Sequence, residues 1–508
     1  MPTLKKLAGE TVIYGMSHIL PRILYFIVLT PYLTYRLKDT GDYGIFSEFY
    51  AYTALILSFM TFRMDTAYFR YANTKTTEER DKVYSTTFVP MMVISLLVFA
   101  GLMVFAPQVA TYLKYPNDIH FVQYFAWILL FDAATTLVYS KFRLDGKPFR
   151  FLFYRVVNVL ASVLALMLFL EILPRFFPDV KTSLDQFLGV RKDLDYTFFA
   201  NVVASAIVFL LMLPELWRVK FSFDKKLLKP ILKYAWPLVV VALAGNINQA
   251  FAAPLQKWLL SGSLTERMSQ VGIFSAAAKL AILLNLFTTA YNYAAEPFFF
   301  NNAAQDTERK MYGKAALSFA VFSSLVVVGI YLFIDILLIL IGTNYRSGVF
   351  VVPFLLVSYI FLGLYYSVSI WYKLSDNTQI GLWISIFGVV LTLLVSWITI
   401  PIFGIIGSAW ASVACYGGML GLSYVLGQKY YPIKYPLKEI MMVIGITLII
   451  LLAAWFMREF LALSLGLRLT FNILIFGIYC VFVWKRFIVK YIDLAKIKSA
   501  IFGRLRKK

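Results

Sequence analysis

Charged residues and cysteines are both scarce in this sequence. Only 15% of its 508 residues are charged, whereas soluble domains carry about 25%. Hydrophobic residues make up 60%, which leaves too little polar surface for a chain that folds in water. The two cysteines, Cys415 and Cys480, both fall in apolar segments and imply no disulfide framework. This composition excludes an ordinary soluble enzyme and indicates a protein embedded in a membrane.

Long polar segments are also missing, and the apolar residues come in blocks of about twenty. A helix of that length crosses the hydrocarbon core of a bilayer. The fold class that we predict is therefore an all-α integral membrane protein with about fourteen transmembrane helices. The predicted spans are residues 10–35, 44–62, 84–106, 120–140, 151–171, 196–213, 231–256, 270–297, 315–341, 348–372, 380–400, 404–427, 438–457 and 469–484.

The net charge of +21 could indicate a nucleic-acid partner, so the placement of the cations is decisive. If the N-terminus is cytoplasmic, the inner segments contain 33 of the 48 Lys and Arg residues and the outer segments contain 11. An excess of cations on one side is the positive-inside rule, which places both termini in the cytoplasm. Attraction to anionic lipid explains the basic tail at residues 486–508, and we predict no nucleic-acid partner.

An internal repeat indicates how the helices are organised. The tetrapeptide Gly-Ile-Phe-Ser opens the second predicted helix at residues 44–47 and the eighth at residues 272–275. Arg143-Leu144 and Lys373-Leu374, at the ends of the fourth and tenth helices, are related by nearly the same offset. Repeats with one orientation are typical of transporters that open alternately to each side. The predicted parts are a six-helix bundle at 1–225, a second at 226–430, two further helices at 431–485 and the cytoplasmic tail at 486–508.

Four segments in this order resemble a known family: the polysaccharide and O-antigen flippases of the multidrug/oligosaccharidyl-lipid/polysaccharide exporter superfamily. These segments are residues 41–47, residues 234–238 (Tyr-Ala-Trp-Pro-Leu), residues 271–277 followed by Lys279, and residues 400–409. The resemblance implies export of an undecaprenyl-diphosphate-linked glycan across the bacterial cytoplasmic membrane. One departure is that the family often has an Asp-Arg pair near the end of the seventh helix, where this chain has Leu255-Gln256-Lys257.

Ionisable residues inside predicted spans are the candidates for substrate binding, because each is costly in hydrocarbon. Tyr14, His18 and Arg22 follow one another at intervals of four and share one helical face. An arginine can hold a diphosphate through two parallel hydrogen bonds. Lys279 lies deep in the eighth helix and shares a face with Ser275. The alternative reading is that these charges pair with acids only to stabilise the packing.

Further candidates lie in other spans. Arg155 is about one turn inside the fifth helix, where it could bind substrate or extend to the inner surface. Asp132, near the centre of the fourth helix, could exchange a proton or form a fixed ion pair with Arg22 or Arg155. Glu48 and Glu296 are weaker candidates for the same roles, and Lys257 is interpreted as a residue at the end of its helix. No cofactor is expected, and coupling to H⁺ or Na⁺ stays open.

Several functions compete with the flippase hypothesis. A lipid II or drug exporter would have the same architecture, although an exporter of cationic drugs should have an acidic cavity. Asp193-Leu194-Asp195 matches the Asp-x-Asp of glycosyltransferases but falls in a predicted outer loop, where nucleotide sugars are absent. A glycan polymerase would need a large outer loop, and a scaffold would have all its buried charges paired. A polymerase or glycosyltransferase could also be a partner of the flippase, beside membrane lipids.

Overall fold

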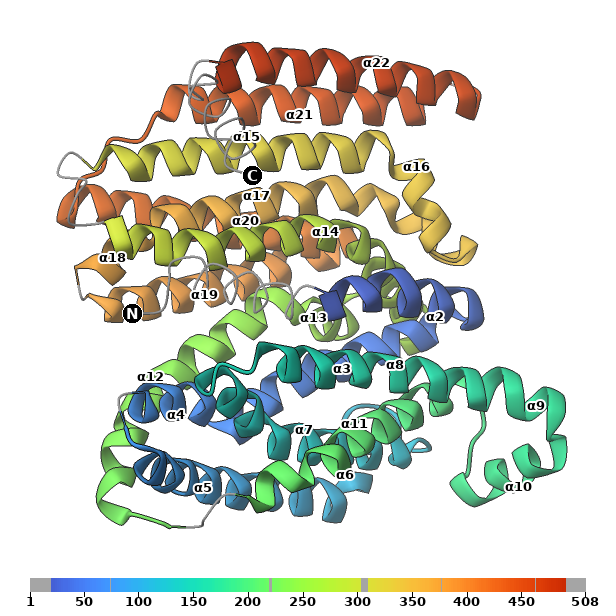
Figure 1. Cartoon of the computed structure of the whole chain (residues 1–508). Coiled ribbons are helices and arrows are strands. Elements are labelled where there is room, and N and C mark those ends of the chain that lie inside the picture. The colour runs from blue at the N-terminus through green and yellow to red at the C-terminus, as the bar shows by residue number, and fades with distance from the viewer. Residues whose placement is uncertain are drawn as a thin grey trace, which may run out of the picture. The chain divides into compact units, whose positions relative to one another are not determined.

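The computed structural model describes residues 20–73, 75–218, 222–302, 309–375, 377–461 and 463–489. Every regular element in these residues is a helix, and none is a strand. Figure 1 shows long helices joined by short connections, with the described chain beginning and ending in helix. The all-α fold class predicted from the sequence is therefore confirmed.

Thirteen helices of the described chain are long and apolar enough to cross a membrane. Each coincides with one of the predicted spans from the second to the fourteenth. They are Thr40–Ala72, Glu78–Val104, Ile119–Leu144, Pro148–Phe176, Asp193–Trp217, Lys225–Ala250, Leu264–Tyr293, Lys310–Leu332, Thr343–Leu374, Gln379–Phe403, Ile405–Tyr430, Leu437–Glu459 and Leu465–Phe487. The first predicted span, 10–35, begins outside the described residues.

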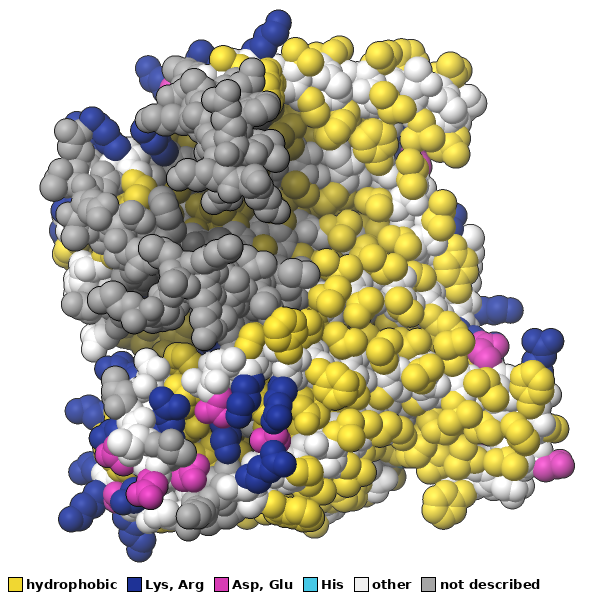
Figure 2. Space-filling model, in the orientation of Figure 1, with side chains coloured by type: hydrophobic (Ala, Val, Ile, Leu, Met, Phe, Trp, Pro, Cys, Tyr) yellow, Lys and Arg dark blue, Asp and Glu magenta, His cyan; other side chains and the backbone are white. Residues whose placement is uncertain are grey.

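Hydrophobic side chains are exposed along the lengths of these helices, as a lipid environment requires. On helix α8 (Pro148–Met167), Phe149, Phe153 and Leu164 are each more than half exposed and lie on one face. On the face that Figure 2 shows, hydrophobic side chains cover a broad area, and many Lys and Arg side chains lie at its margins. The chain is a multi-pass membrane protein.

The chain groups by its internal contacts into two compact units. Unit 1 comprises Met1–Lys279, Leu340–Val349 and Thr378–Cys415, and unit 2 comprises Leu280–Ile339, Phe350–Asn377 and Tyr416–Lys508. Helices α14 (Leu264–Asn302) and α20 (Ile405–Tyr430) pass from one unit into the other. The division into six-helix bundles at 1–225 and 226–430 was drawn from the sequence repeat and stays a prediction.

Unit 1 contains most of the helices from the N-terminal half of the sequence. Their bounds are η1 Tyr25–Leu29, α2 Thr30–Arg36, α3 Thr40–Thr61, α4 Met64–Ala72, α5 Thr77–Val104, α6 Ala106–Tyr112, α7 Ile119–Leu144, η2 Leu168–Ile172, α9 Leu173–Phe176, α10 Pro178–Leu188, α11 Asp193–Trp217, α12 Lys225–Ala250, α13 Ala252–Leu259 and α19 Thr378–Phe403, together with α8 and η4 Thr343–Val351. Helix α11 packs on α7 and α8, and α12 packs on α3 and α19. A core that includes Tyr68, Tyr84, Phe142 and Phe151 fills the space between α4, α5, α7 and α8.

Unit 2 contains the other helices. Their bounds are α15 Lys310–Leu332, α16 Ile334–Leu337, η3 Leu338–Leu340, α17 Val352–Val368, α18 Ile370–Leu374, α21 Leu437–Glu459, α22 Leu465–Val483 and η5 Trp484–Ile488. Helix α15 packs against α17, α21 and α22. Tyr479 of α22 donates a hydrogen bond to Ser324 of α15 at 2.7 Å. Asp335 lies 2.9 Å from Arg468 and 3.5 Å from Arg458, so one acid joins three helix ends.

The two copies of the Gly-Ile-Phe-Ser repeat contact each other inside unit 1. A methyl group on Gly44 of α3 would collide with the Met268 carbonyl of α14, and one on Gly272 would collide with the Thr40 carbonyl. Only glycine permits this approach of two backbones. The repeated motif therefore has a packing role, which explains why the residue recurs at both positions.

Candidate functional site

Lys279 lies inside unit 1 without an acidic partner. Its ammonium is 5.7 Å from the centre of the Tyr25 ring, and among the described residues no carboxylate forms an ion pair with it. A charged side chain in a membrane span requires a partner or water. Tyr25 belongs to η1, a stretch of π-helix, which is frequent at functional sites. The geometry therefore leaves a cation available to bind an anion.

Arg22 lies three residues before Tyr25 in the same continuous helical stretch. Residues at this spacing share a helical face, so Arg22 is on the side of the helix that carries Tyr25. The Arg22 side chain is exposed, and Ser275 lies one turn before Lys279 on α14. The structure thus brings the helix that carries Arg22 and Tyr25 to Lys279. That these cations bind a substrate stays a prediction.

Two predicted site residues, Tyr14 and His18, lie outside the described residues, as does the side chain of Glu296. Tyr25 was missed by the sequence analysis. The signal was present, because Tyr25 continues the polar face one turn after Arg22.

A second polar group surrounds Asp132 of α7. Ser205 of α11 donates a hydrogen bond to Asp132 Oδ1 at 3.0 Å, and Arg155 of α8 interacts with this carboxylate electrostatically. No Lys or Arg nitrogen of the described chain forms an ion pair with it within 4.0 Å. The fixed ion pair with Arg22 or Arg155 is therefore absent from this part of the structure, and the proton-exchange alternative stays a prediction.

Arg155 is exposed, yet it does not face the lipid side of its helix. Phe149, Phe153, Leu160 and Leu164 mark the exposed apolar face of α8. At 100° per residue, Arg155 lies about 150° around the helix from the middle of that face. Its guanidinium is 4.1 Å from the centre of the Tyr139 ring, where it stacks on the aromatic face. Arg155 therefore points into unit 1 and does not extend to the lipid.

Tyr50 of α3 connects these two groups. It is an electrostatic neighbour of Tyr25 and also of Asp132. Tyr50 thus interacts electrostatically both with Tyr25, beside Lys279, and with Asp132, beside Arg155. Sequence reasoning found the charged members but missed Tyr50 and Ser205, because helical spacing relates residues only within one helix.

Glu48 and Lys257 form a different kind of charged contact. Lys257 Nζ lies 2.8 Å and 3.0 Å from the two Glu48 oxygens, and the two side chains are 1% and 0% exposed. The Lys257 ammonium also donates to the Leu113 carbonyl, and the Tyr115 hydroxyl donates to Glu48 at 2.7 Å. Burial, and next the Glu48 carboxylate, raise the pKa of Tyr115 well above its usual range, so this hydroxyl keeps its proton.

This contact gives Lys257 a partner that the sequence did not predict. The residue lies in the last turn of α13, as its predicted helix-end position implied, and it is buried in an ion pair. Its neighbour Gln256 is also buried and donates a hydrogen bond to Ser408 at 2.9 Å. At the position where the resembling family carries an Asp-Arg pair, this chain thus connects α13 to α3 and α20. Such a satisfied ion pair is a structural contact.

The Asp-x-Asp segment is used to begin helix α11. Asp195 is buried, and it accepts hydrogen bonds from the backbone N–H groups of Arg191 at 2.6 Å and Lys192 at 3.0 Å. His120 Nε2 lies 3.1 Å from the other Asp195 oxygen. A carboxylate at this position satisfies N–H groups that a helix start leaves unpaired.

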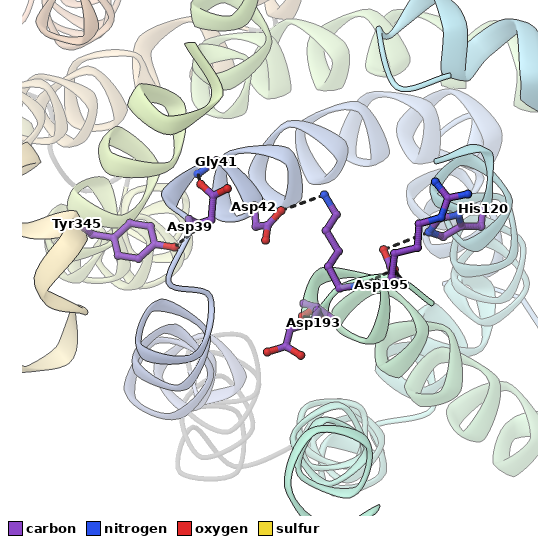
Figure 3. A network of polar contacts seen from close by, with 10 residues as sticks. Asp39, Gly41, Asp42, His120, Asp193, Asp195 and Tyr345 are labelled. Atoms are coloured by element: carbon purple, nitrogen blue, oxygen red, sulfur yellow. Dashed lines mark hydrogen bonds and ion pairs between the residues drawn. The ribbon is translucent and has the colours of Figure 1, made fainter. Parts of the chain in front are cut away.

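Two carboxylates near Asp195, those of Asp42 and Asp193, form ion pairs, and Figure 3 shows the contact of Asp42. Lys192 Nζ lies 3.0 Å from Asp42, and Arg36 Nε lies 3.0 Å from Asp193. Both carboxylates of the Asp-x-Asp segment therefore have structural partners. In the described parts of the chain, no three His, Cys, Asp or Glu side chains come together as a metal ion would require.

Comparison with known families shows to which family the chain belongs. The family described as polysaccharide biosynthesis protein matches residues 7–303, which is more than half of the sequence. The chain belongs to this family. A comparison with curated protein sequences found no match.

Solved structures of two kinds share the fold of this polysaccharide biosynthesis family member. A lipid II flippase MurJ in an inward closed conformation superposes with a TM-score of 0.70 at 15% identity, covering 94% of this chain and 100% of that one. A multidrug resistance MATE family transporter of the MOP superfamily, inward-facing, gives a TM-score of 0.59 at 12% identity, covering 85% and 96%. The fold is that of flippases and transporters.

Proposed function

We propose that this protein moves an undecaprenyl-diphosphate-linked oligosaccharide from the cytoplasmic to the periplasmic leaflet of a bacterial cytoplasmic membrane. The unit of cargo would be an O-antigen, capsule or exopolysaccharide repeat. Membership in a polysaccharide biosynthesis family supports a glycan cargo, and the shared fold supports movement across a membrane. The excess of cations in the predicted inner segments supports cytoplasmic termini.

The observation that carries this proposal is the cation Lys279, which has no acidic partner in the described chain and lies beside the helix of Arg22. A diphosphate has two negative charges, and the guanidinium fork can hold two of its oxygens at once. The polar head would therefore enter unit 1 while the polyprenyl tail stays in lipid. No bond of the cargo is made or broken, so the protein acts as a transporter and not as an enzyme.

Alternating access would complete the cycle. The head group binds while the site is open to the cytoplasm, and it is released after the site has opened to the other side. Unpaired cations suit this cycle, because a charge already held by a protein acid would bind the diphosphate only after that ion pair had broken. Asp132 lies within a membrane span and forms no ion pair in the described chain, which makes it the candidate for coupling to H⁺.

Proteoliposomes that contain a fluorescent undecaprenyl-diphosphate oligosaccharide test the proposal. We expect the parent protein to expose the labelled lipid to an impermeant quencher in the outer leaflet, with its covalent structure unchanged. Arg22→Ala and Lys279→Glu should nearly abolish this movement, and Arg22→Lys should reduce it partially. Lys75→Ala, which removes an exposed cation paired with Glu79, serves as the matched control. Parental rates in both Arg22→Ala and Lys279→Glu would overturn the proposal.

The second candidate cargo is lipid II, and the superposition on the lipid II flippase supports it. Both cargoes have a polyprenyl diphosphate, so both fit the same cations. The discriminating assay supplies lipid II and an O-antigen-type lipid in separate vesicles. Faster movement of lipid II would favour the second candidate. A cationic drug as cargo is disfavoured, because Lys279 and Arg22, which form no ion pair with any described acid, would repel it.

A further inference from the structure

Several polar groups of α7 and α8 lack a hydrogen-bond partner in the described part of unit 1. Asp132 uses one oxygen for Ser205, and the Asn158 amide and the Arg155 guanidinium form no hydrogen bond with any described residue. In a membrane-spanning unit such groups are costly unless water or a ligand satisfies them. Their chemistry therefore points to a bound molecule rather than to packing.

These groups face the same space. Arg155 and Asn158 are three residues apart on α8, and both lie about 150° from the middle of its lipid-facing side. Asp132 and Tyr139 are seven residues apart, on one face of α7. Arg155 connects the two helices, because it stacks on Tyr139 and interacts with Asp132. The set extends along about 10 Å of helix, enough for one or two sugar rings.

A nearby amide gives a contrast. The Asn201 side chain donates to the Thr197 carbonyl at 2.8 Å and accepts a hydrogen bond from Ser162 at 3.3 Å. Asn201 is thus satisfied by the protein, whereas Asn158 is not. A carboxylate, an amide and a guanidinium together supply the acceptors and donors that the hydroxyl groups of a sugar require.

We infer that Asp132, Asn158 and Arg155, with the Tyr139 hydroxyl, form a subsite for the sugar next to the diphosphate. This inference rests on the proposed function, since the diphosphate is placed at Lys279 and the sugar continues past Tyr50 toward Asp132. The Asp132 carboxylate accepts hydrogen bonds from sugar hydroxyls, and the Asn158 amide both donates and accepts. The subsite would select cargo by its first sugar, while the cations bind any polyprenyl diphosphate.

Binding of two probes to the full-length protein in nanodiscs tests the subsite. The probes are undecaprenyl diphosphate and undecaprenyl diphosphate with one N-acetylhexosamine. We expect the parent protein to bind the glycosylated probe more tightly. Asn158→Ala and Asp132→Asn should each weaken binding of the glycosylated probe about tenfold and change binding of the bare diphosphate less than twofold. Lys279→Ala should weaken the binding of both probes by the same factor.

Asn201→Ala is the matched control, because it removes an amide of the same kind whose partners are protein groups. We expect it to lower the unfolding temperature and to leave the ratio of the two affinities unchanged. The subsite is wrong if Asn158→Ala and Asp132→Asn weaken the binding of both probes by the same factor. It is also wrong if the parent protein binds the two probes with equal affinity. In both cases the proposed function stands. If neither probe binds the parent protein, the proposed function fails and the subsite with it.

Discussion

Two regions of unit 1 hold charged side chains in opposite ways. At Glu48 and Lys257, each charge faces its opposite at hydrogen-bond distance, and Tyr115 and the Leu113 carbonyl complete the contacts. At Lys279, no acid of the described chain pairs with the cation. A buried charge that is fully paired holds the fold together, whereas an unpaired one is available to a ligand. The contrast separates a structural contact from a candidate binding site.

The largest effect on stability is expected at the paired region. Lys257→Met would leave the Glu48 carboxylate buried without compensation, which costs about 3–5 kcal/mol. We expect a large fall in the unfolding temperature of the purified protein. The double variant Glu48→Gln with Lys257→Met removes both charges and should recover most of the loss. A double variant as unstable as Lys257→Met alone would show that the loss does not come from an uncompensated Glu48 charge.

A smaller loss is expected where the repeated glycines meet. Gly44→Ala introduces a methyl group against the Met268 carbonyl, and the backbones of α3 and α14 must separate to accept it. Such overpacking typically costs about 1–3 kcal/mol. Gly101→Ala is the control, because a methyl group there would meet nothing within 4 Å. Equal unfolding temperatures for the two variants would contradict the close approach.

The smallest effect on stability is expected at the unpaired cation. Lys279→Ala removes a charge that no described acid compensates. The free energy of unfolding should therefore fall by less than about 1 kcal/mol, or should rise. The same variant should lose transport. Thermal unfolding measured beside transport of the labelled lipid therefore distinguishes Lys279 from Lys257. A loss of stability as large as that of Lys257→Met would place Lys279 in the structural class and weaken the proposed site.

The sequence predicted more of the fold than of the site. Thirteen of the fourteen predicted spans coincide with helices of the structure, because a helix must bury its own backbone polar groups in lipid and its apolar length is fixed by the bilayer. The site was harder to predict. Arg155 and Asp132 lie within spans as predicted, but the ion pair of Lys257 was missed, since its partner Glu48 is more than two hundred residues away.

By itself, then, the sequence determined the membrane environment, the helical spans and the resemblance to a flippase family, since these depend on composition, on local hydrophobic length and on short motifs. Only the tertiary structure decided which charges are neutralised. Helical periodicity tells which residues share a face, yet pairing depends on which faces of distant helices meet. Glu48 forms a buried ion pair with Lys257, which is a structural contact. Lys279 instead lies beside the ring of Tyr25, so its charge is available to a ligand.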